Sequence, residues 1–159
     1  MKERIKIAVQ KSGRLTEHSI SLLQKCGLII SHTKDQLIGY GENMPFDIMF
    51  VRDDDIPGLI QENLCEIGIV GANVAREKQL SYESSRSSSN FDLESSLDFG
   101  HCKLSFAYPE SSSIRSVNDL DGKTIATSYP FTVKNYFTKH SIDATVSYTH
   151  LRAHETGYN

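Results

Sequence analysis

The sequence has little cysteine and no long hydrophobic run. Its three cysteines, Cys26, Cys65 and Cys102, are far apart and odd in number, which suits neither a disulfide framework nor a CxxC metal site. We therefore expect three reduced thiols. No apolar stretch approaches the roughly 18 residues that a membrane-spanning helix requires, and charges interrupt the apolar part of the N-terminus, unlike a secretory signal. These absences predict a cytoplasmic protein with no membrane partner.

An excess of positive charge is also lacking. The chain has 17 Lys and Arg against 20 Asp and Glu, a net charge of -3, so we expect no nucleic-acid partner. What the sequence does have is 38% hydrophobic residues, enough to bury a core, which excludes wholesale disorder. A length of 159 residues fits one domain or two small lobes.

The hydrophobic pattern predicts an α/β lobe first. Residues 5–9 alternate as a strand does and stop at the polar turn QKSGR of residues 10–14. Residues 15–26 have helical spacing and end at Gly27, a favourable helix C-cap. The pattern then repeats as strand, charged turn, helix and strand, at residues 46–51, 52–55, 56–64 and 65–70. Such βαβ units form a mainly parallel sheet.

A serine-rich stretch follows this lobe. Residues 81–96 are half serine and lack a steady period, which predicts a surface loop or linker. We therefore divide the chain into a first lobe at 1–90 and a second α/β lobe at 91–146. The second lobe is expected to contain two strands and a helix, at residues 103–108, 124–127 and 130–140.

Polar residues follow the carboxyl ends of the predicted strands, where open parallel sheets bind ligands. Lysine is a point charge, arginine is a planar fork for two phosphate oxygens, and glycine lets the backbone approach closely. The QKSGR turn is therefore a candidate phosphate cradle, although solvated loop charges explain it equally well. The candidate binding residues at strand ends are Lys11, Gly13, Arg14, Arg52, Gly71, Ser128 and Tyr129.

Three other groups of residues have weaker chemical interpretations. Asp53, Asp54 and Asp55 can hold magnesium, but stabilisation of a helix start explains them better. His101 and Cys102 are neighbours on a predicted strand and so face opposite ways, which disfavours a nucleophile and base pair. His150 and His154 lack a third ligand. We predict no metal site built by protein ligands, and no catalytic residue is assigned.

Five blocks of the sequence resemble the long form of the ATP phosphoribosyltransferase family, in the same order along the chain. They are QKSGRL at 10–15, ENMPFDIMFVRDDDIPGLI at 42–60, EIGIVGANV at 66–74, LDFGHCKLS at 97–105 and KTIATSYP at 123–130. The resemblance implies a two-lobed fold of the periplasmic-binding-protein type. It also implies the first step of histidine biosynthesis, in which ATP and 5-phosphoribosyl 1-diphosphate give phosphoribosyl-ATP and pyrophosphate.

The same resemblance implies Mg²⁺ bound with the substrate phosphates, and a homo-oligomer for a complete family member. Carried over by position, the cleft residues are those of the glycine-basic turn, Arg52, the pair Asp98 and Phe99, and the pair Ser128 and Tyr129. One departure from the family is Ala72, where an acidic residue is common.

A larger departure follows Val146. There the family continues with a strand and a loop that binds the phosphoribosyl phosphate, whereas this chain has SYTHLRAHETGYN. We therefore interpret residues 147–159 as a non-native tail, and the second lobe as incomplete. By the same resemblance, we expect the return segment of the first lobe and the regulatory domain that binds histidine to be absent from this chain. These departures predict that the chain alone is inactive, and a noncatalytic module that binds anionic small molecules, or an inert fragment, remains as an alternative.

Overall fold

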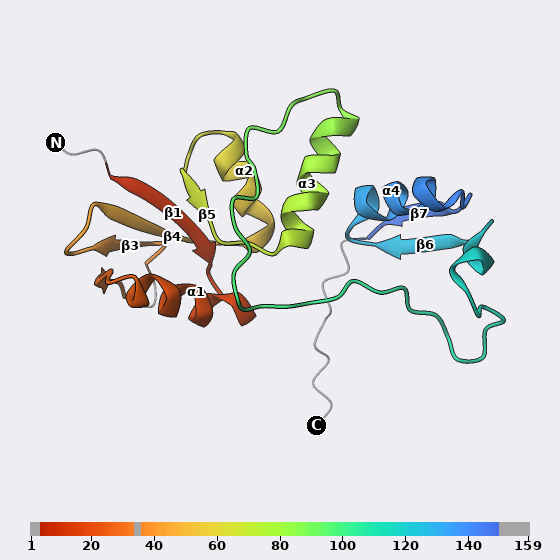
Figure 1. The fold of residues 1–159 in the computed structure, drawn as a ribbon, viewed down its shortest axis with the longest axis horizontal. Coiled ribbons are helices and arrows are strands. Elements are labelled where there is room, and N and C mark those ends of the chain that lie inside the picture. Colours follow the sequence, from red (N-terminus) through yellow and green to blue (C-terminus); the bar gives the residue numbers. More distant parts are fainter. Residues whose placement is uncertain (1–3, 34–35, 150–159) are drawn as a thin grey trace. The chain divides into compact units, whose positions relative to one another are not determined.

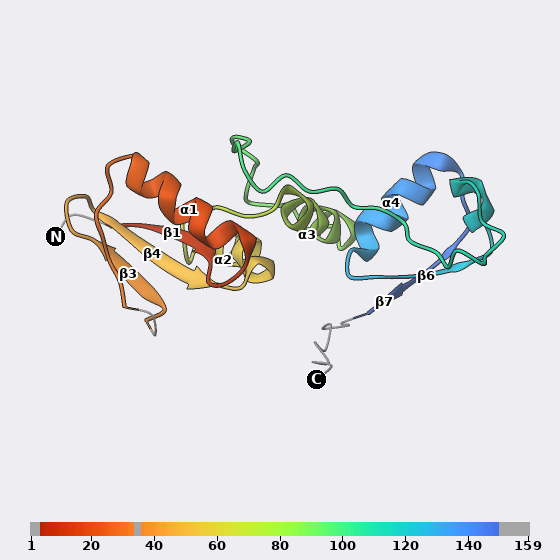
Figure 2. The same cartoon turned by 90° about the horizontal axis from the view of Figure 1, so that it is seen from below.

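The fold is described from a computed structural model, which describes residues 4–33 and 36–149. The chain divides into two compact units, Met1–Leu104 and Ser105–Asn159, called unit 1 and unit 2 below. Both units are mixed α/β (Figures 1 and 2). The sequence prediction set its lobe boundary at residue 90, within the serine-rich stretch.

Unit 1 contains a five-stranded sheet in the order β2-β3-β4-β1-β5. Its strands are β1 (Ile5–Gln10), β2 (Ile30–Ser31), β3 (Ile38–Gly41), β4 (Phe46–Val51) and β5 (Ile67–Gly68). β1 pairs in parallel with both β4 and β5, whereas β3 pairs antiparallel with β2 and β4. The prediction of a mainly parallel sheet is therefore wrong for half of the pairings, because β2 and β3 are too short to give a periodic signal.

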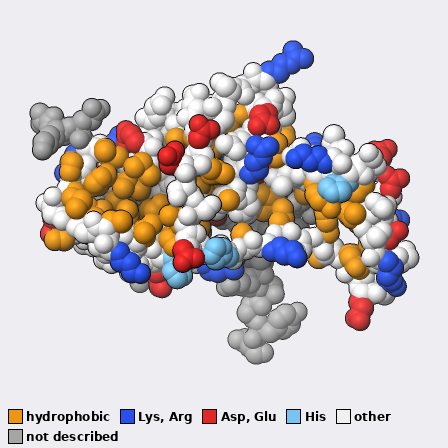
Figure 3. Space-filling view, in the orientation of Figure 1, with side chains coloured by type: hydrophobic (Ala, Val, Ile, Leu, Met, Phe, Trp, Pro, Cys, Tyr) orange, Lys and Arg blue, Asp and Glu red, His pale blue; other side chains and the backbone are white. Residues whose placement is uncertain are grey.

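Helices cover both faces of this sheet. They are α1 (Arg14–Lys25), the 3-10 turn η1 (Asp53–Asp55), α2 (Ile56–Gln61) and α3 (Ala72–Ser84). Val9 and Ile48 belong to one core cluster, against which leucines of α1 pack, whereas Ala8 and Ile56 belong to a second cluster on the α2 side. This alternation of faces follows from the two-residue period of a strand. Figure 3 shows hydrophobic side chains gathered over this unit.

Three predicted boundaries in unit 1 need correction. The helix expected to reach residue 64 ends at Gln61, and Asn63 follows with a left-handed φ of 56°. The strand expected at 65–70 forms a ladder only at Ile67–Gly68, although Ile69 N still donates to Ala8 O at 2.9 Å. Residues 81–84 of the expected linker are the last turn of α3.

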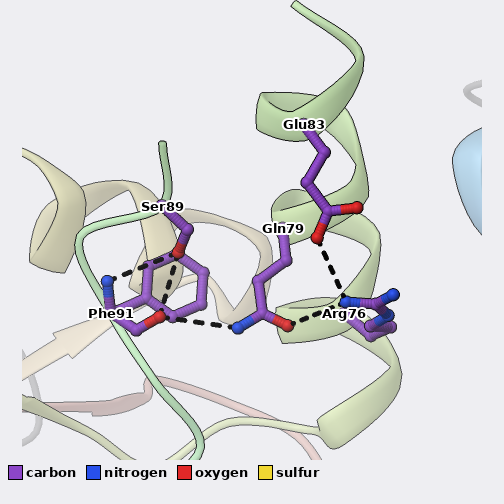
Figure 4. A network of polar contacts seen from close by, with 5 residues as sticks. All are labelled: Arg76, Gln79, Glu83, Ser89 and Phe91. Atoms are coloured by element: carbon purple, nitrogen blue, oxygen red, sulfur yellow. Dashed lines mark hydrogen bonds and ion pairs between the residues drawn. The ribbon is translucent and has the colours of Figure 1, made fainter. Parts of the chain in front are cut away.

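The serine-rich loop after α3 is anchored rather than free. Gln79 Nε2 donates to Phe91 O at 3.5 Å, and Ser89 Oγ donates to the same oxygen at 2.9 Å (Figure 4). On the helix, Arg76 contacts Gln79 Oε1 at 3.5 Å and Glu83 Oε1 at 3.4 Å. The Phe91 side chain is buried. The loop is therefore held against α3 of unit 1 by the buried Phe91 side chain and by the hydrogen bond from Gln79.

Unit 2 is a smaller βαβ unit. Its elements are the 3-10 turn η2 (Val117–Leu120), β6 (Thr124–Thr127), α4 (Pro130–His140) and β7 (Thr145–Tyr148). β6 and β7 pair in parallel, and the core is formed by Leu120, Val133, Phe137 and Ile142. The helix and strand predicted at 130–140 and 124–127 are confirmed.

The strand predicted at 103–108 is wrong. Residues 103–108 are not in a strand, and the described sheet of unit 2 contains β6 and β7 alone. Phe106 instead packs its ring against Phe137, with centroids 5.5 Å apart, and against Tyr136 at 5.6 Å. The apolar pattern there serves side-chain packing rather than strand pairing.

The segment interpreted as a non-native tail, residues 147–159, begins inside a strand. Its first two residues, Ser147 and Tyr148, belong to β7 and lie opposite Ala126 and Thr127. Residues 150–159, including His150 and His154, lie outside the described residues. Within the described part of the chain, no helix is long and apolar enough to cross a membrane.

Candidate anion-binding site

Three neighbouring parallel strands of unit 1 end at one edge of the sheet. β4, β1 and β5 lie side by side, and Gln10 at the end of β1 is opposite Val51 at the end of β4. The Lys11 backbone N–H donates to Val51 O at 2.7 Å, which continues the ladder by one bond. Lys11 and Arg52 therefore follow paired strand ends, and the chain after β5 reaches Gly71 at the same edge. The structure thus brings together cations that the sequence placed at separate strand ends.

The turn between β1 and α1 is held by a side chain that the sequence analysis did not select. Gly13 has a φ of 129°, which favours glycine, and a Cβ there would lie 2.6 Å from Gln10 Nε2. Gln10 Oε1 accepts a hydrogen bond from Leu15 N at 3.2 Å. Because Gly13 has no side chain to cap α1, Gln10 performs this role from the preceding strand. Its position at a strand end, before Lys11, is the only signal that the sequence offers.

The cations at this edge form no ion pair among the residues that the structure describes. Lys11, Arg14 and Arg52 are all exposed, and no ion pair within residues 4–33 and 36–149 involves them. Arg14 is also the first residue of α1, where the helix dipole favours an anion. This edge can therefore attract a phosphate by charge.

Gly71 begins the third element at the edge. Its carbonyl accepts hydrogen bonds from Val74 N at 3.0 Å and Ala75 N at 3.1 Å, so it is the N-cap of α3. A Cβ at Gly71 would lie 2.7 Å from Asn73 Oδ1. Ala72, the residue that departs from the family pattern, is exposed as the first residue of α3.

Asp98 and Phe99 lie on a segment that packs on α1. The Phe99 ring stacks on His18 with centroids 5.4 Å apart, and Gly100, at a φ of 71°, fits directly against Leu15 in the first turn of α1. Asp98 is exposed, and its Oδ1 lies 3.7 Å from His101 Nε2. The segment therefore lies beside the helix that begins at the cationic turn, although it is far away in sequence.

Ser128 and Tyr129 occupy the corresponding junction of unit 2. They lie between β6 and α4, where Tyr129 N donates to Thr127 Oγ1 at 3.0 Å and Val133 N donates to Tyr129 O at 3.0 Å. This junction also stands at the carboxyl end of a parallel strand, but it carries neutral side chains.

The weaker interpretations have the following geometry. Cys102 Sγ lies 3.9 Å from Asn73 Oδ1, and both Cys102 and His101 are exposed. Burial, followed by the charge of Glu66, raises the pKa of the Cys65 thiol, which leaves that group unreactive. Asp55 is the N-cap residue of α2 but makes no side-chain capping bond. In the part of the chain that is described, no cluster of three or more His, Cys, Asp or Glu can hold a metal ion.

Comparison with known proteins identifies the family. Residues 52–150 match the family model described as ATP phosphoribosyltransferase. The chain belongs to the ATP phosphoribosyltransferase family. It is 42% identical over 146 residues to an ATP phosphoribosyltransferase from Xylella fastidiosa (strain M12), covering 92% of this chain and 48% of that relative. The family resemblance found in the sequence is thereby confirmed, and the chain spans about half the length of the curated relative it matches.

A solved structure has a similar fold. It is a chain of the ATP phosphoribosyl transferase (HisG:HisZ) complex from Thermotoga maritima, with a TM-score of 0.58 and 19% sequence identity. The similarity covers 91% of this chain and 64% of that chain. It supports the mixed α/β architecture of this member of the ATP phosphoribosyltransferase family.

Proposed function

We propose that a protein containing this chain transfers the phosphoribosyl group of 5-phosphoribosyl 1-diphosphate to ATP. The products are phosphoribosyl-ATP and pyrophosphate, in the first step of histidine biosynthesis. The observation that carries this proposal within the family is the edge formed by β4, β1 and β5. Three exposed cations, Lys11, Arg14 and Arg52, follow these strands or begin the next helix, and none has an ion-pair partner among the described residues.

The reaction needs charge and positioning more than a nucleophilic side chain. N1 of the adenine attacks the anomeric carbon, the bond from that carbon to pyrophosphate breaks, and the leaving group takes the electron pair. Cations at the strand ends stabilise the negative charge that develops on pyrophosphate. Gly13 and Gly71 let backbone N–H groups approach phosphate oxygens.

We assign the remaining site residues supporting roles. Asp98 and Phe99 lie on the segment that packs on α1, and Ser128 and Tyr129 offer neutral hydrogen-bonding groups in unit 2. The proposal includes a two-lobed architecture of the periplasmic-binding-protein type. It also includes a cytoplasmic location and association of the protein with further copies of itself. The Thermotoga relative is described as part of a complex, which is consistent with association.

Magnesium fits this edge as a companion of substrate phosphates. Asp53, Asp54 and Asp55 follow Arg52 directly, so carboxylate oxygens lie next to the cationic edge. Mg²⁺ usually binds one or two carboxylates together with substrate phosphates and water, rather than a cage of protein ligands. When bound, it would neutralise charge on the diphosphate, and Lys11 and Arg52 would supply the protein's own share of that neutralisation.

Isothermal titration of the 159-residue chain with ATP and with tripolyphosphate tests the proposed site. The double variant Lys11→Ala, Arg14→Ala should weaken binding of each anion by roughly a hundredfold or more, since each charge-assisted contact is worth about 1.5–3 kcal/mol. Lys25→Ala is the matched control, because Lys25 is an exposed cation in the last turn of the same helix. Equal affinities for the double variant and the control would contradict the assignment.

A further inference from the structure

The side-chain amide of Gln10, at the end of β1, is bonded to the protein at one of its two polar atoms. The backbone N–H of Leu15 lies 3.2 Å from this amide and can only donate, so the bonded atom of the amide is its oxygen, Oε1. The nitrogen, Nε2, has two N–H groups and makes no hydrogen bond within the described residues 4–33 and 36–149. Gln10 is half-buried, and its Nε2 is not among the unpaired polar atoms that the protein buries, so a ligand can reach it.

This amide lies on the cationic turn itself. A Cβ at Gly13 would lie 2.6 Å from Gln10 Nε2 and 2.9 Å from both Cδ and Oε1, so the whole amide group lies against Gly13. In the chain, Gly13 stands between Lys11 and Arg14, and both cations are exposed. The unpaired donor of Gln10 therefore belongs to the same turn as the two positive charges.

Two backbone N–H groups in the first turn of α1 are already bonded within the protein. Leu15 N donates to Gln10 Oε1, and Thr16 N donates to Gly13 O at 3.3 Å. Helix starts usually bind anions through such backbone N–H groups. Here the Gln10 amide occupies one of them with its oxygen and offers its own N–H groups in the same turn, so a side-chain donor replaces a backbone donor.

We infer that Gln10 is a further anion-binding residue, whose Nε2 donates a hydrogen bond to an oxygen of a polyphosphate bound at the turn of Lys11 to Arg14. The inference rests on the proposed function and deepens it, because it adds a neutral, directional donor to a site described so far by its cations. A lysine attracts an anion as a point charge, whereas an amide N–H binds best along its own axis. Since Oε1 is fixed on Leu15 N, Gln10 orients the phosphate relative to the start of α1.

Two single substitutions separate the loss of the donor from the effect of an added charge. Gln10→Glu keeps an acceptor for Leu15 N, removes the N–H donors and adds a negative charge. Ser12→Glu is the matched control, since it adds the same charge at an exposed position of the same turn and leaves the Gln10 donors in place. In titration calorimetry of the 159-residue chain, Gln10→Glu should weaken tripolyphosphate binding about tenfold more than Ser12→Glu, because a hydrogen bond to a charged group is lost. Equal weakening by the two variants would overturn the inference.

Nuclear magnetic resonance of the unaltered ¹⁵N-labelled chain, titrated with tripolyphosphate, observes the donor itself. The side-chain NH₂ signals of Gln10, assigned by their loss in Gln10→Glu, should shift saturably together with the backbone amides of residues 11–14. Gln24 is the internal control, because it is an exposed glutamine near the other end of α1, and its NH₂ signals should not move. Backbone shifts in the turn without a shift of the Gln10 NH₂ signals would overturn the inference and leave the proposed site standing. If neither set of signals shifted, the proposed site and the inference would both be wrong.

Discussion

The junction between β1 and α1 and the junction between β6 and α4 use the same construction with different chemistry. Each places polar residues after a parallel strand and at the start of a helix. The first has Lys11 and Arg14 around Gly13, fixed by the Gln10 amide. The second has neutral Ser128 and Tyr129, with Thr127 Oγ1 accepting the Tyr129 N–H. Under the function proposed above, the first junction would bind substrate by charge and the second by neutral hydrogen bonds.

The two junctions also belong to sheets and hydrophobic cores of different size. The first belongs to a five-stranded sheet with core clusters on both faces, and the second to two strands and one helix with a single small core. Two strands with one covering helix bury little apolar surface, so unit 2 has the smaller reserve of stability. Substitutions at the two junctions and in the two cores can therefore separate effects on ligand binding from effects on the stability of each unit.

The largest effect is expected in the small core. Phe137→Ala should cost about 3–5 kcal/mol and unfold unit 2, because a buried ring is removed from a core with few members. Ile48→Ala, in the centre of unit 1, should cost about 2–5 kcal/mol and leave unit 1 weakened. Hydrogen exchange resolved by segment measures both.

Tyr108→Ala is the surface control for this comparison, since Tyr108 is exposed. It should change stability by less than about 0.5 kcal/mol. If Phe137→Ala reduced hydrogen-exchange protection in unit 1 as much as in unit 2, the two units would not be separately stabilised, which would contradict the account.

A smaller effect is expected at the turn of the first junction. Gly13→Ala places a side chain at a φ of 129° and against the Gln10 amide, which should cost about 1–3 kcal/mol. Ser128→Ala at the second junction should cost less than about 0.5 kcal/mol, because Ser128 is exposed. Thermal unfolding measures the loss of stability in both variants. A larger loss for Ser128→Ala than for Gly13→Ala would contradict the prediction.

Removing the capping amide should have a still smaller effect. Gln10→Ala leaves the Leu15 N–H without its acceptor and should destabilise unit 1 by about 1 kcal/mol. Gln10→Glu keeps an acceptor and should preserve stability, but its negative charge should weaken tripolyphosphate binding at the adjacent cations. Urea unfolding and calorimetry distinguish these outcomes. A destabilised Gln10→Glu would show that packing rather than capping explains the position of Gln10.

The smallest effect is a pH dependence in unit 2. Backbone N–H groups of Arg115 and Ser116 donate to Asp119 Oδ2 at 2.9 and 2.8 Å and lower the pKa of this carboxyl below its ordinary value of 3.8. Because the folded pKa is below the unfolded one, the ionised carboxylate stabilises unit 2 above about pH 4. This contribution disappears as the pH falls through the folded pKa.

Asp119→Asn should therefore have a lower melting temperature than the wild type near pH 6 and a similar one near pH 2. Melting curves across this range are the measurement. A difference that persists unchanged at pH 2 would show that the stabilisation does not depend on ionisation of Asp119.

The sequence predicted the elements whose hydrophobic pattern extends over several residues. β1, β4, α1 and α4 are all of this kind, and their observed bounds are close to the expected ones. β2 has two residues, too few for a period, and α3 buries only Val74 and Ala75. These elements are determined by partners distant in sequence, so their own residues give little signal.

The candidate site divides in the same way. The positions of Lys11, Arg52 and Gly71 at strand ends follow from the local pattern together with the rule that parallel strands end at one edge. The Gln10 bond to Leu15 and the fit of Gly100 against Leu15 depend on side-chain packing. Composition and spacing contain no information on such contacts.

The most direct test of the central claim is nuclear magnetic resonance of the ¹⁵N-labelled chain titrated with ATP. If the charged junction of unit 1 binds the phosphates, the largest amide shifts should occur in residues 11–16, near Arg52 and at Gly71, and high salt should reduce them. Shifts confined to residues 128–133 of unit 2, or the absence of saturable shifts in the turn of residues 11–16, would contradict the account.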